Sequence, residues 1–154
     1  MIARRLLAVV PALALAAFAL PAAAETWRMN SQGGNHFSLL DTDYLSRSGN
    51  TAKVREMKLY DPAEEFNGQM TRAWIIEYEV NCTDGTYSTR SAQIYDDTVK
   101  VVLSSPLNGE PKRPNAGTVG EDMINTACGR RQLLQGRSYS REEVIRLVVG
   151  GGRP

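Results

Sequence analysis

Residues 72–82, which read RAWIIEYEVNC, have the most regular pattern in the chain. Apolar side chains occupy every second position, and apart from Ile75 the residues between them are small or polar. Side chains of a β-strand alternate between two faces, so this pattern predicts a strand with one face in the core. The expected core face carries Trp74, Ile76, Tyr78, Val80 and Cys82, and the other face carries Ala73, Ile75, Glu77, Glu79 and Asn81.

Further strands are expected on both sides of this stretch. Asp84-Gly85 favours a hairpin, after which residues 86–95 return as an antiparallel neighbour. Strands are also predicted at residues 27–29, 36–40, 51–60 and 98–104. They are separated by a turn at 31–35, a turn or short helical segment at 41–50 and a connector at 61–69. The sequence therefore predicts an antiparallel sheet.

The periodicity changes after a loop rich in Pro and Gly at residues 105–117. Thr118 and Glu121 have capping-box spacing, and the apolar residues that follow recur at helical intervals. The expected buried stripe contains Val119, Met123, Ile124, Ala127 and Cys128, and Gly129 is suited to end the helix. Ser140 and Glu143 repeat the capping pattern, which predicts a short terminal helix ending at Gly150 to Gly152.

Residues 1–24 have the three zones of an export signal: Arg4 and Arg5, an apolar run, and small residues before Glu25. The alternative is an N-terminal membrane anchor, but the apolar run is shorter than the roughly 20 residues that span a bilayer. We expect a cleaved signal peptide. The Ala- and Leu-rich leader with its short positive region indicates a periplasmic, secreted or outer-surface protein of a Gram-negative bacterium. No transmembrane segment is expected after cleavage.

Removal of Arg4 and Arg5 with the leader leaves 16 of the 18 basic residues, against 17 acidic ones. The resulting net charge of about −1, with His36 neutral, argues against a nucleic-acid-binding protein. The 130 remaining residues suit one domain. We expect an α+β domain at 25–131 and a C-terminal tail at 132–154 with a short helix.

Cys82 and Cys128 are the only cysteines, and both follow the leader. An even number of cysteines in an oxidising compartment favours a disulfide, which would connect the middle of the sheet to the late helix. The alternative is two separate buried thiols. A single His and two distant Cys lack the spacing of a metal site, so neither a metal nor another cofactor is expected.

Catalytic chemistry has little support in the sequence. His36 is the only histidine, and a Ser-His-Asp set with Asp41 or Asp43 lacks a nucleophile motif. We expect no catalytic residue and interpret the paired carboxylates at 41/43, 64/65 and 96/97 as solvated turn and surface positions. Glu77 and Glu79 share the outer strand face, where they are either polar surface residues or partners of basic groups.

A candidate binding surface comes from aromatic and basic residues. Tyr87 and Tyr95 are expected on one face of the return strand, together with Thr89, Ser91 and Gln93. Such a polar and aromatic face suits protein binding, although ordinary sheet packing would place the same residues there. Arg130, Arg131 and Arg137 form a small basic cluster after the helix, where they complement the helix dipole or contact an acidic partner.

The order of these parts resembles the surface-adhesin protein E-like family of Gram-negative bacteria. The resemblance covers residues 26–131 and depends on the strand ending Glu79-Val80-Asn81-Cys82, the Ser104-Ser105-Pro106 segment and the helix ending Ala127-Cys128. It implies an antiparallel sheet with a C-terminal helix tethered by a disulfide between Cys82 and Cys128. The best-known member binds host extracellular-matrix and serum proteins, but no ligand-binding motif of the family is matched here.

We therefore expect an α+β fold, with a single antiparallel β-sheet and a C-terminal helix packed on one face and tethered by a disulfide. The expected function is non-enzymatic, adhesin-like binding of a protein or cell-envelope component. The alternatives are a structural or stress-related periplasmic protein without a dedicated ligand, and a small hydrolase that uses His36. Pairing of edge strands between two chains would give a homodimer.

Overall fold

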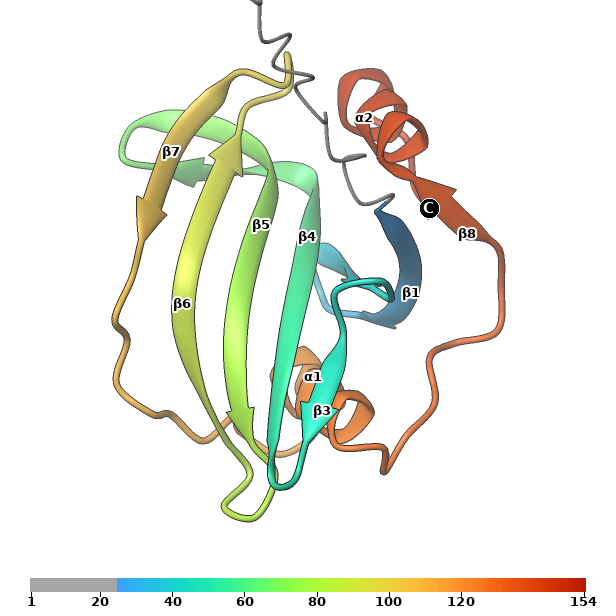
Figure 1. Ribbon diagram of the computed structural model, residues 1–154. Helices are drawn as coiled ribbons and strands as arrows, with labels where there is room; N and C mark the ends of the chain where they lie inside the picture. Colours follow the sequence, from blue (N-terminus) through green and yellow to red (C-terminus); the bar gives the residue numbers. More distant parts are fainter. Residues whose placement is uncertain (1–24) are drawn as a thin grey trace, which may run out of the picture.

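The computed structural model describes residues 25–154, and the predicted signal peptide lies outside the described residues. This part of the chain forms one antiparallel sheet of eight strands and two helices (Figure 1). The spatial order is β7-β6-β5-β4-β2-β1-β8, and β3 pairs with β4. The strands are β1 (Thr26–Gln32), β2 (His36–Asp41), β3 (Ser46–Ser48), β4 (Thr51–Phe66), β5 (Gln69–Asn81), β6 (Thr86–Tyr95), β7 (Val101–Pro106) and β8 (Ser138–Ser140). The helices are α1 (Val119–Ala127) and α2 (Arg141–Gly150).

The predicted strand at 72–82 is confirmed as part of β5, which lies in the middle of the sheet between β4 and β6. Ile76, Tyr78 and Val80 are buried on one face, as the alternation predicted, while Trp74 is half-buried against the same cluster. Gly85 has a φ of +64° in the turn between β5 and β6. This left-handed conformation explains the glycine of the Asp84-Gly85 hairpin signal.

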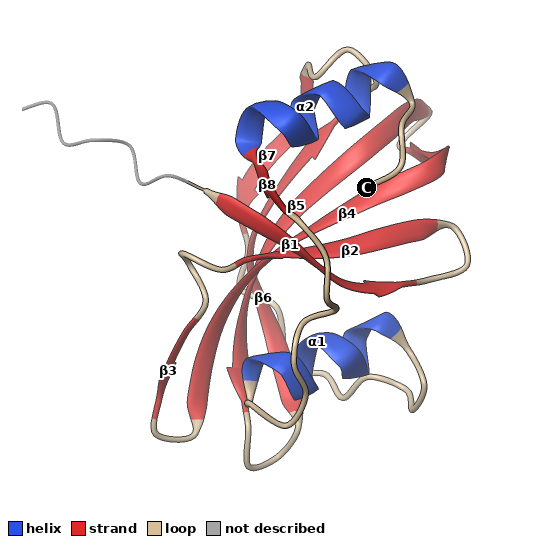
Figure 2. Cartoon of the chain, turned by 90° about the vertical axis from the view of Figure 1, so that its right-hand side faces the viewer, coloured by secondary structure: helices blue, strands red, loops and turns tan. Residues whose placement is uncertain are grey.

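The two faces of the sheet carry separate cores. On one face, α1 packs on a cluster that includes Leu40, Val54, Ile76, Tyr78 and Val80. On the other face, α2 packs on Trp27, Phe37, Leu39, Met57 and Leu59. Neighbouring strand residues such as Leu39 and Leu40 belong to different clusters because their side chains point to opposite faces. Figure 2 shows α1 and α2 at opposite ends of the molecule.

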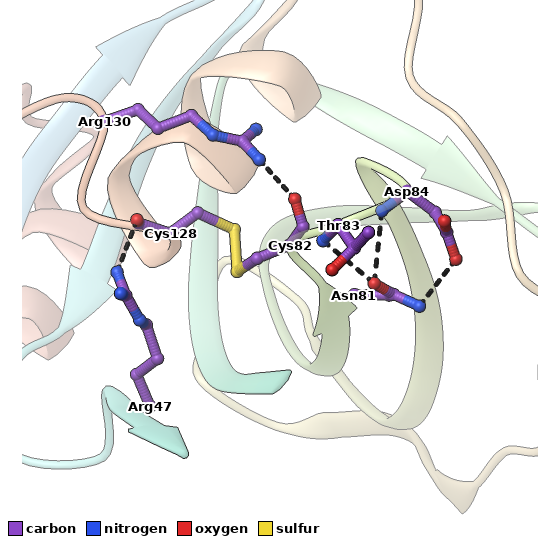
Figure 3. Close-up of a disulfide and its surroundings, with 7 residues drawn as sticks. All are labelled: Arg47, Asn81, Cys82, Thr83, Asp84, Cys128 and Arg130. Atoms are coloured by element: carbon purple, nitrogen blue, oxygen red, sulfur yellow. Dashed lines mark hydrogen bonds between the residues drawn. A yellow bond between two sulfur atoms is a disulfide. The ribbon is translucent and has the colours of Figure 1, made fainter. Parts of the chain in front are cut away.

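The predicted disulfide between Cys82 and Cys128 is present, and it joins the end of β5 to the C-cap residue of α1 (Figure 3). The two Cα atoms are 5.5 Å apart. Arg47 donates from Nη1 to the Cys128 carbonyl oxygen over 2.6 Å, and Arg130 donates from Nη2 to the Cys82 carbonyl oxygen. The backbone carbonyl of each bridged cysteine therefore accepts a hydrogen bond from an arginine side chain.

Three sequence-based boundaries were wrong. The segment at 41–50 contains β3, which pairs with the start of β4. The expected connector at 61–69 is instead the end of β4 and the start of β5, joined by a tight turn in which Asn67 and Gly68 both have positive φ. The strand predicted at 98–104 is β7, which starts at Val101 because Asp96 Oδ1 accepts hydrogen bonds from the backbone amides of Thr98 and Lys100.

The C-terminal residues complete the fold. β8 pairs with β1, and the predicted terminal helix is present as α2. The Ser140 side chain accepts from the Glu143 amide, and the Glu143 carboxylate accepts from the Ser140 amide, so both halves of the capping box are formed. Val144 and Val148 then lie buried against the sheet. The tail thus covers the second face of the sheet.

Candidate functional site

An open hollow of about 650 Å³ lies where the first turn of α1 approaches the sheet. We call it the basic hollow. Four parts of the chain line it: the β1–β2 turn with His36, Lys58 of β4, Tyr87 of β6, and the segment from Arg113 to the start of α1. Each part is positioned by the fold, since β2, β4 and β6 belong to the sheet and the Cys82–Cys128 disulfide holds the far end of α1.

Close packing fixes the side of the hollow formed by the β1–β2 turn. Gly33 lies so near to its neighbours that a Cβ atom there would come within 2.9 Å of His36 Cε1 and 3.2 Å of Val119 Cγ2. The His36 ring packs on Tyr60 with 5.3 Å between centroids, and its Nδ1 lies 3.1 Å from Asn35 Oδ1. A side chain at position 33 would therefore require the His36 ring and the Val119 side chain to shift.

His36 is a weak base in this position. Burial lowers the pKa of its imidazole below 6.5, and the nearby Lys58 ammonium lowers it further. Its Nε2 atom is buried and makes no hydrogen bond to the described residues. At neutral pH the ring is therefore predominantly uncharged, and the positive charge of the hollow comes from other groups.

Lys58 and Arg113 supply that charge. Lys58 Nζ is 4.0 Å from Glu56, a fully buried carboxyl whose pKa is raised by burial. Arg113 is exposed and has no carboxylate within 4.0 Å in residues 25–154. Asp122 is the one carboxylate among the lining residues, and it pairs with Arg131 at 2.7 Å. The surface of the hollow therefore has an excess of positive charge.

The first turn of α1 adds aligned backbone dipoles to this charge. Thr118, Val119 and Gly120 line the hollow, and helix N-termini carry amide groups without intrahelical acceptors. Thr118 caps the helix by accepting from the Glu121 amide at 3.4 Å. The Glu121 carboxylate accepts from Gly117 N at 2.7 Å, so the capping-box spacing predicted the N-terminus correctly, although the glutamate reaches one residue further back.

Of the four residues predicted to form a binding surface, only Tyr87 lines the basic hollow. Its ring packs edge-on against Tyr78, with 5.3 Å between centroids. Tyr95 lies on the opposite face, where it packs against the cluster under α2 and donates from its hydroxyl to Gln93. The expectation that Tyr87 and Tyr95 share a face was wrong, because a β-bulge at Arg90 reverses the alternation between them.

Arg130 and Arg131 lie at the other end of α1. Arg130 binds the Cys82 carbonyl, and Arg131 pairs with Asp122. Both side chains thus make intramolecular contacts around the end of the helix.

The other groups considered for catalysis or binding lie far apart or already form ion pairs within the chain. His36 begins β2 and Asp41 ends it, with Asp41 Oδ2 only 3.2 Å from Arg55 Nη1. Glu77 accepts from Arg55 at 2.8 Å, and Glu79 accepts from Arg90 at 3.1 Å, so both glutamates have basic partners within the chain. Across residues 25–154, no three His, Cys, Asp or Glu side chains are grouped to hold a metal ion.

Neither α1 nor α2 has the length and apolarity needed to cross a bilayer. A comparison with protein families matches residues 27–129 to the surface-adhesin protein E family. No curated protein and no solved structure gives a significant match. The family match starts in β1 and ends just after Cys128, so it includes the central strand, both cysteines and α1. The chain belongs to the surface-adhesin protein E family.

Proposed function

We propose that this protein is an exported, adhesin-like binding protein that recognises a protein or cell-envelope component without catalysing a reaction. Membership of a family of surface adhesins supports this proposal. So does the combination of an export-type leader and a disulfide, which suits an oxidising compartment outside the cytoplasm.

The observation that carries the proposal is the basic hollow. It is an open, concave surface built by four separate parts of the chain, and its cationic groups are not neutralised by its own carboxylates. Binding sites combine a hollowed surface with a few convergent polar groups, and charge complementarity speeds association with a partner. We assign the contact with the partner to this surface.

Binding rather than catalysis is favoured by the arrangement of the reactive groups. His36 is the only histidine, its pKa is lowered, and Asp41 lies at the opposite end of the same strand. A general base needs a reacting group within hydrogen-bond reach and an orienting partner. Asn35 is the only polar partner of the imidazole in the described part of the chain.

Affinity capture tests this function. The processed protein, with its disulfide intact, is immobilised and exposed to solubilised cell envelope and to extracellular-matrix extracts. We expect saturable capture of a partner that is reduced by raised salt, because the proposed contact is electrostatic. Failure to retain any partner, together with turnover of a substrate that is lost in His36→Ala, would establish a hydrolase instead.

A further inference from the structure

We infer that the basic hollow binds an acidic peptide segment, in which two or more carboxylates along an extended chain reach Lys58, Arg113 and the first turn of α1. This inference rests on the proposed binding function and specifies its ligand class. Three observations support it: where the charges lie, how large and open the hollow is, and which partners the neighbouring acidic groups already have.

The charges come from different elements that line one hollow. Lys58 belongs to β4, Arg113 belongs to the loop before α1, and the helix dipole contributes at Thr118 to Gly120. Most basic side chains near the opposite sheet face already have partners, such as Arg55 with Glu77 and Arg90 with Glu79. Arg113 has no such partner among the described residues, so it is available to a ligand.

The shape favours a chain over a small ion. The hollow is open to solvent and measures about 650 Å³, which is many times the roughly 30 Å³ share of one water molecule. A single phosphate would contact only part of it, whereas an extended acidic segment would place successive carboxylates against separate cations. Gly34 and Gly117 leave room for a backbone to pass close to the surface, because no atom lies within 4 Å of the Cβ position at either residue.

The acidic groups nearby leave the cations available. Glu56 approaches Lys58 only to 4.0 Å, and its carboxyl also accepts a hydrogen bond from the Ser38 hydroxyl. Asp122 is held by Arg131, and Glu121 is occupied by the Gly117 amide. An incoming carboxylate therefore displaces no strong ion pair within the hollow.

The test measures binding of a fluorescein-labelled hexaglutamate peptide to the processed protein by fluorescence anisotropy at low salt. The variant Lys58→Gln/Arg113→Gln is expected to bind roughly tenfold more weakly, because two charge-assisted contacts are lost. The matched control Lys53→Gln/Lys100→Gln removes the same net charge from two exposed lysines outside the hollow and should bind like the wild type. Circular dichroism verifies that each variant is folded.

Each outcome decides the inference. Equal weakening in both double variants would overturn it, since only net charge would then matter. Complete displacement of the peptide by an equal concentration of inorganic phosphate would also overturn it in favour of a small-anion site. If Lys58→Gln/Arg113→Gln fails to fold, the single change Arg113→Gln in the exposed loop replaces it, with Lys100→Gln as control, and a threefold loss is expected.

Failure of this inference can be distinguished from failure of the proposed function. If the wild type captures an extract partner that Lys58→Gln/Arg113→Gln captures equally well, the protein binds by another surface and the inference is wrong. If the wild type captures no partner at all, the proposed function fails regardless of the peptide result.

Discussion

At the scale of single residues, Glu56 is a carboxyl group buried inside the sheet. It is 1% exposed, and it lies between Leu40 and Ile76 in the strand register, on the face that α1 covers. Burial raises the pKa of the carboxyl above 4.5, because it outweighs the nearby Lys58 ammonium and the hydrogen bond that Ser38 donates. The folded state therefore binds a proton at this site more tightly than the unfolded chain does.

This shift predicts a pH-dependent stability. A raised folded pKa gives a contribution that is fully present below the unfolded pKa and is lost as pH rises through the folded value. Glu56→Gln removes the ionisation and retains an oxygen that accepts from Ser38. We expect the free energy of unfolding of the variant to rise relative to that of the wild type as the pH increases above 4.5, as measured by urea unfolding.

The control for this prediction is Glu65→Gln, because Glu65 lies exposed on the same strand. The difference in free energy of unfolding between this variant and the wild type should not change over the same pH range. A Glu56→Gln curve that runs parallel to the wild-type curve would show that Glu56 does not titrate in the range and that the proposed linkage is wrong.

At the scale of elements, the disulfide connects β5 with α1 across a separation of 46 residues. In the chain-entropy treatment, opening such a loop costs about 4 kcal/mol of stability. We expect Cys82→Ser/Cys128→Ser to lose roughly that amount in urea unfolding. A reducing agent should destabilise the wild type similarly and leave the variant unchanged. Equal unfolding midpoints for the wild type and the variant would contradict the assigned role of the bridge.

The capping box of α2 gives a second prediction at this scale. Ser140→Ala removes the hydroxyl that accepts from the Glu143 amide, and it should cost about 1 kcal/mol in urea unfolding. Backbone amides in the first turn of α2 should exchange faster with solvent. Ser138→Ala is the control, because Ser138 is also exposed in β8 but caps no helix. Equal losses in both variants would mean that the cap itself contributes nothing.

The sequence predicted the helices better than the sheet. Both N-caps, at Thr118 and Ser140, occur where the capping spacing placed them, because these signals are local. Alternation in β5 identified its core face, but it did not show that Ala73 lies in a second core. That burial comes from α2, about 70 residues later, and no local pattern encodes it.

The same limit applies to the candidate site. The sequence singled out His36 and Tyr87, which both line the basic hollow. Lys58 and Arg113 belong to no motif, and only the packing of α1 on the sheet brings them to one surface. Tyr95 was predicted on the wrong face because one additional residue in β6, Arg90, reverses the alternation. No residue type in this segment indicates the bulge.

At the scale of the whole molecule, one sheet supports two cores whose coverings come from different parts of the chain. The family match ends at residue 129, so β8 and α2 lie outside it. Tyr139, Val144 and Val148 of this C-terminal part are nevertheless buried against Trp27 and the strands around it. The C-terminal segment therefore contributes to the stability of the whole fold.

Removal of the tail tests this dependence. A chain ending at Arg131 lacks the burial of Tyr139, Val144 and Val148 and exposes the apolar cluster around Trp27, because β8 and α2 are gone. At about 1.5–3 kcal/mol for each buried side chain, the free energy of unfolding should fall by at least about 4 kcal/mol. Urea unfolding measures this loss, and increased binding of an apolar dye reports the exposed face. A chain lacking only Pro154 is the control, since it keeps α2, the hydrogen bond from the Gly152 amide to the Leu147 carbonyl and the Arg153–Asp61 ion pair. Should the chain ending at Arg131 unfold at the wild-type urea concentration, the second core would not be a determinant of stability.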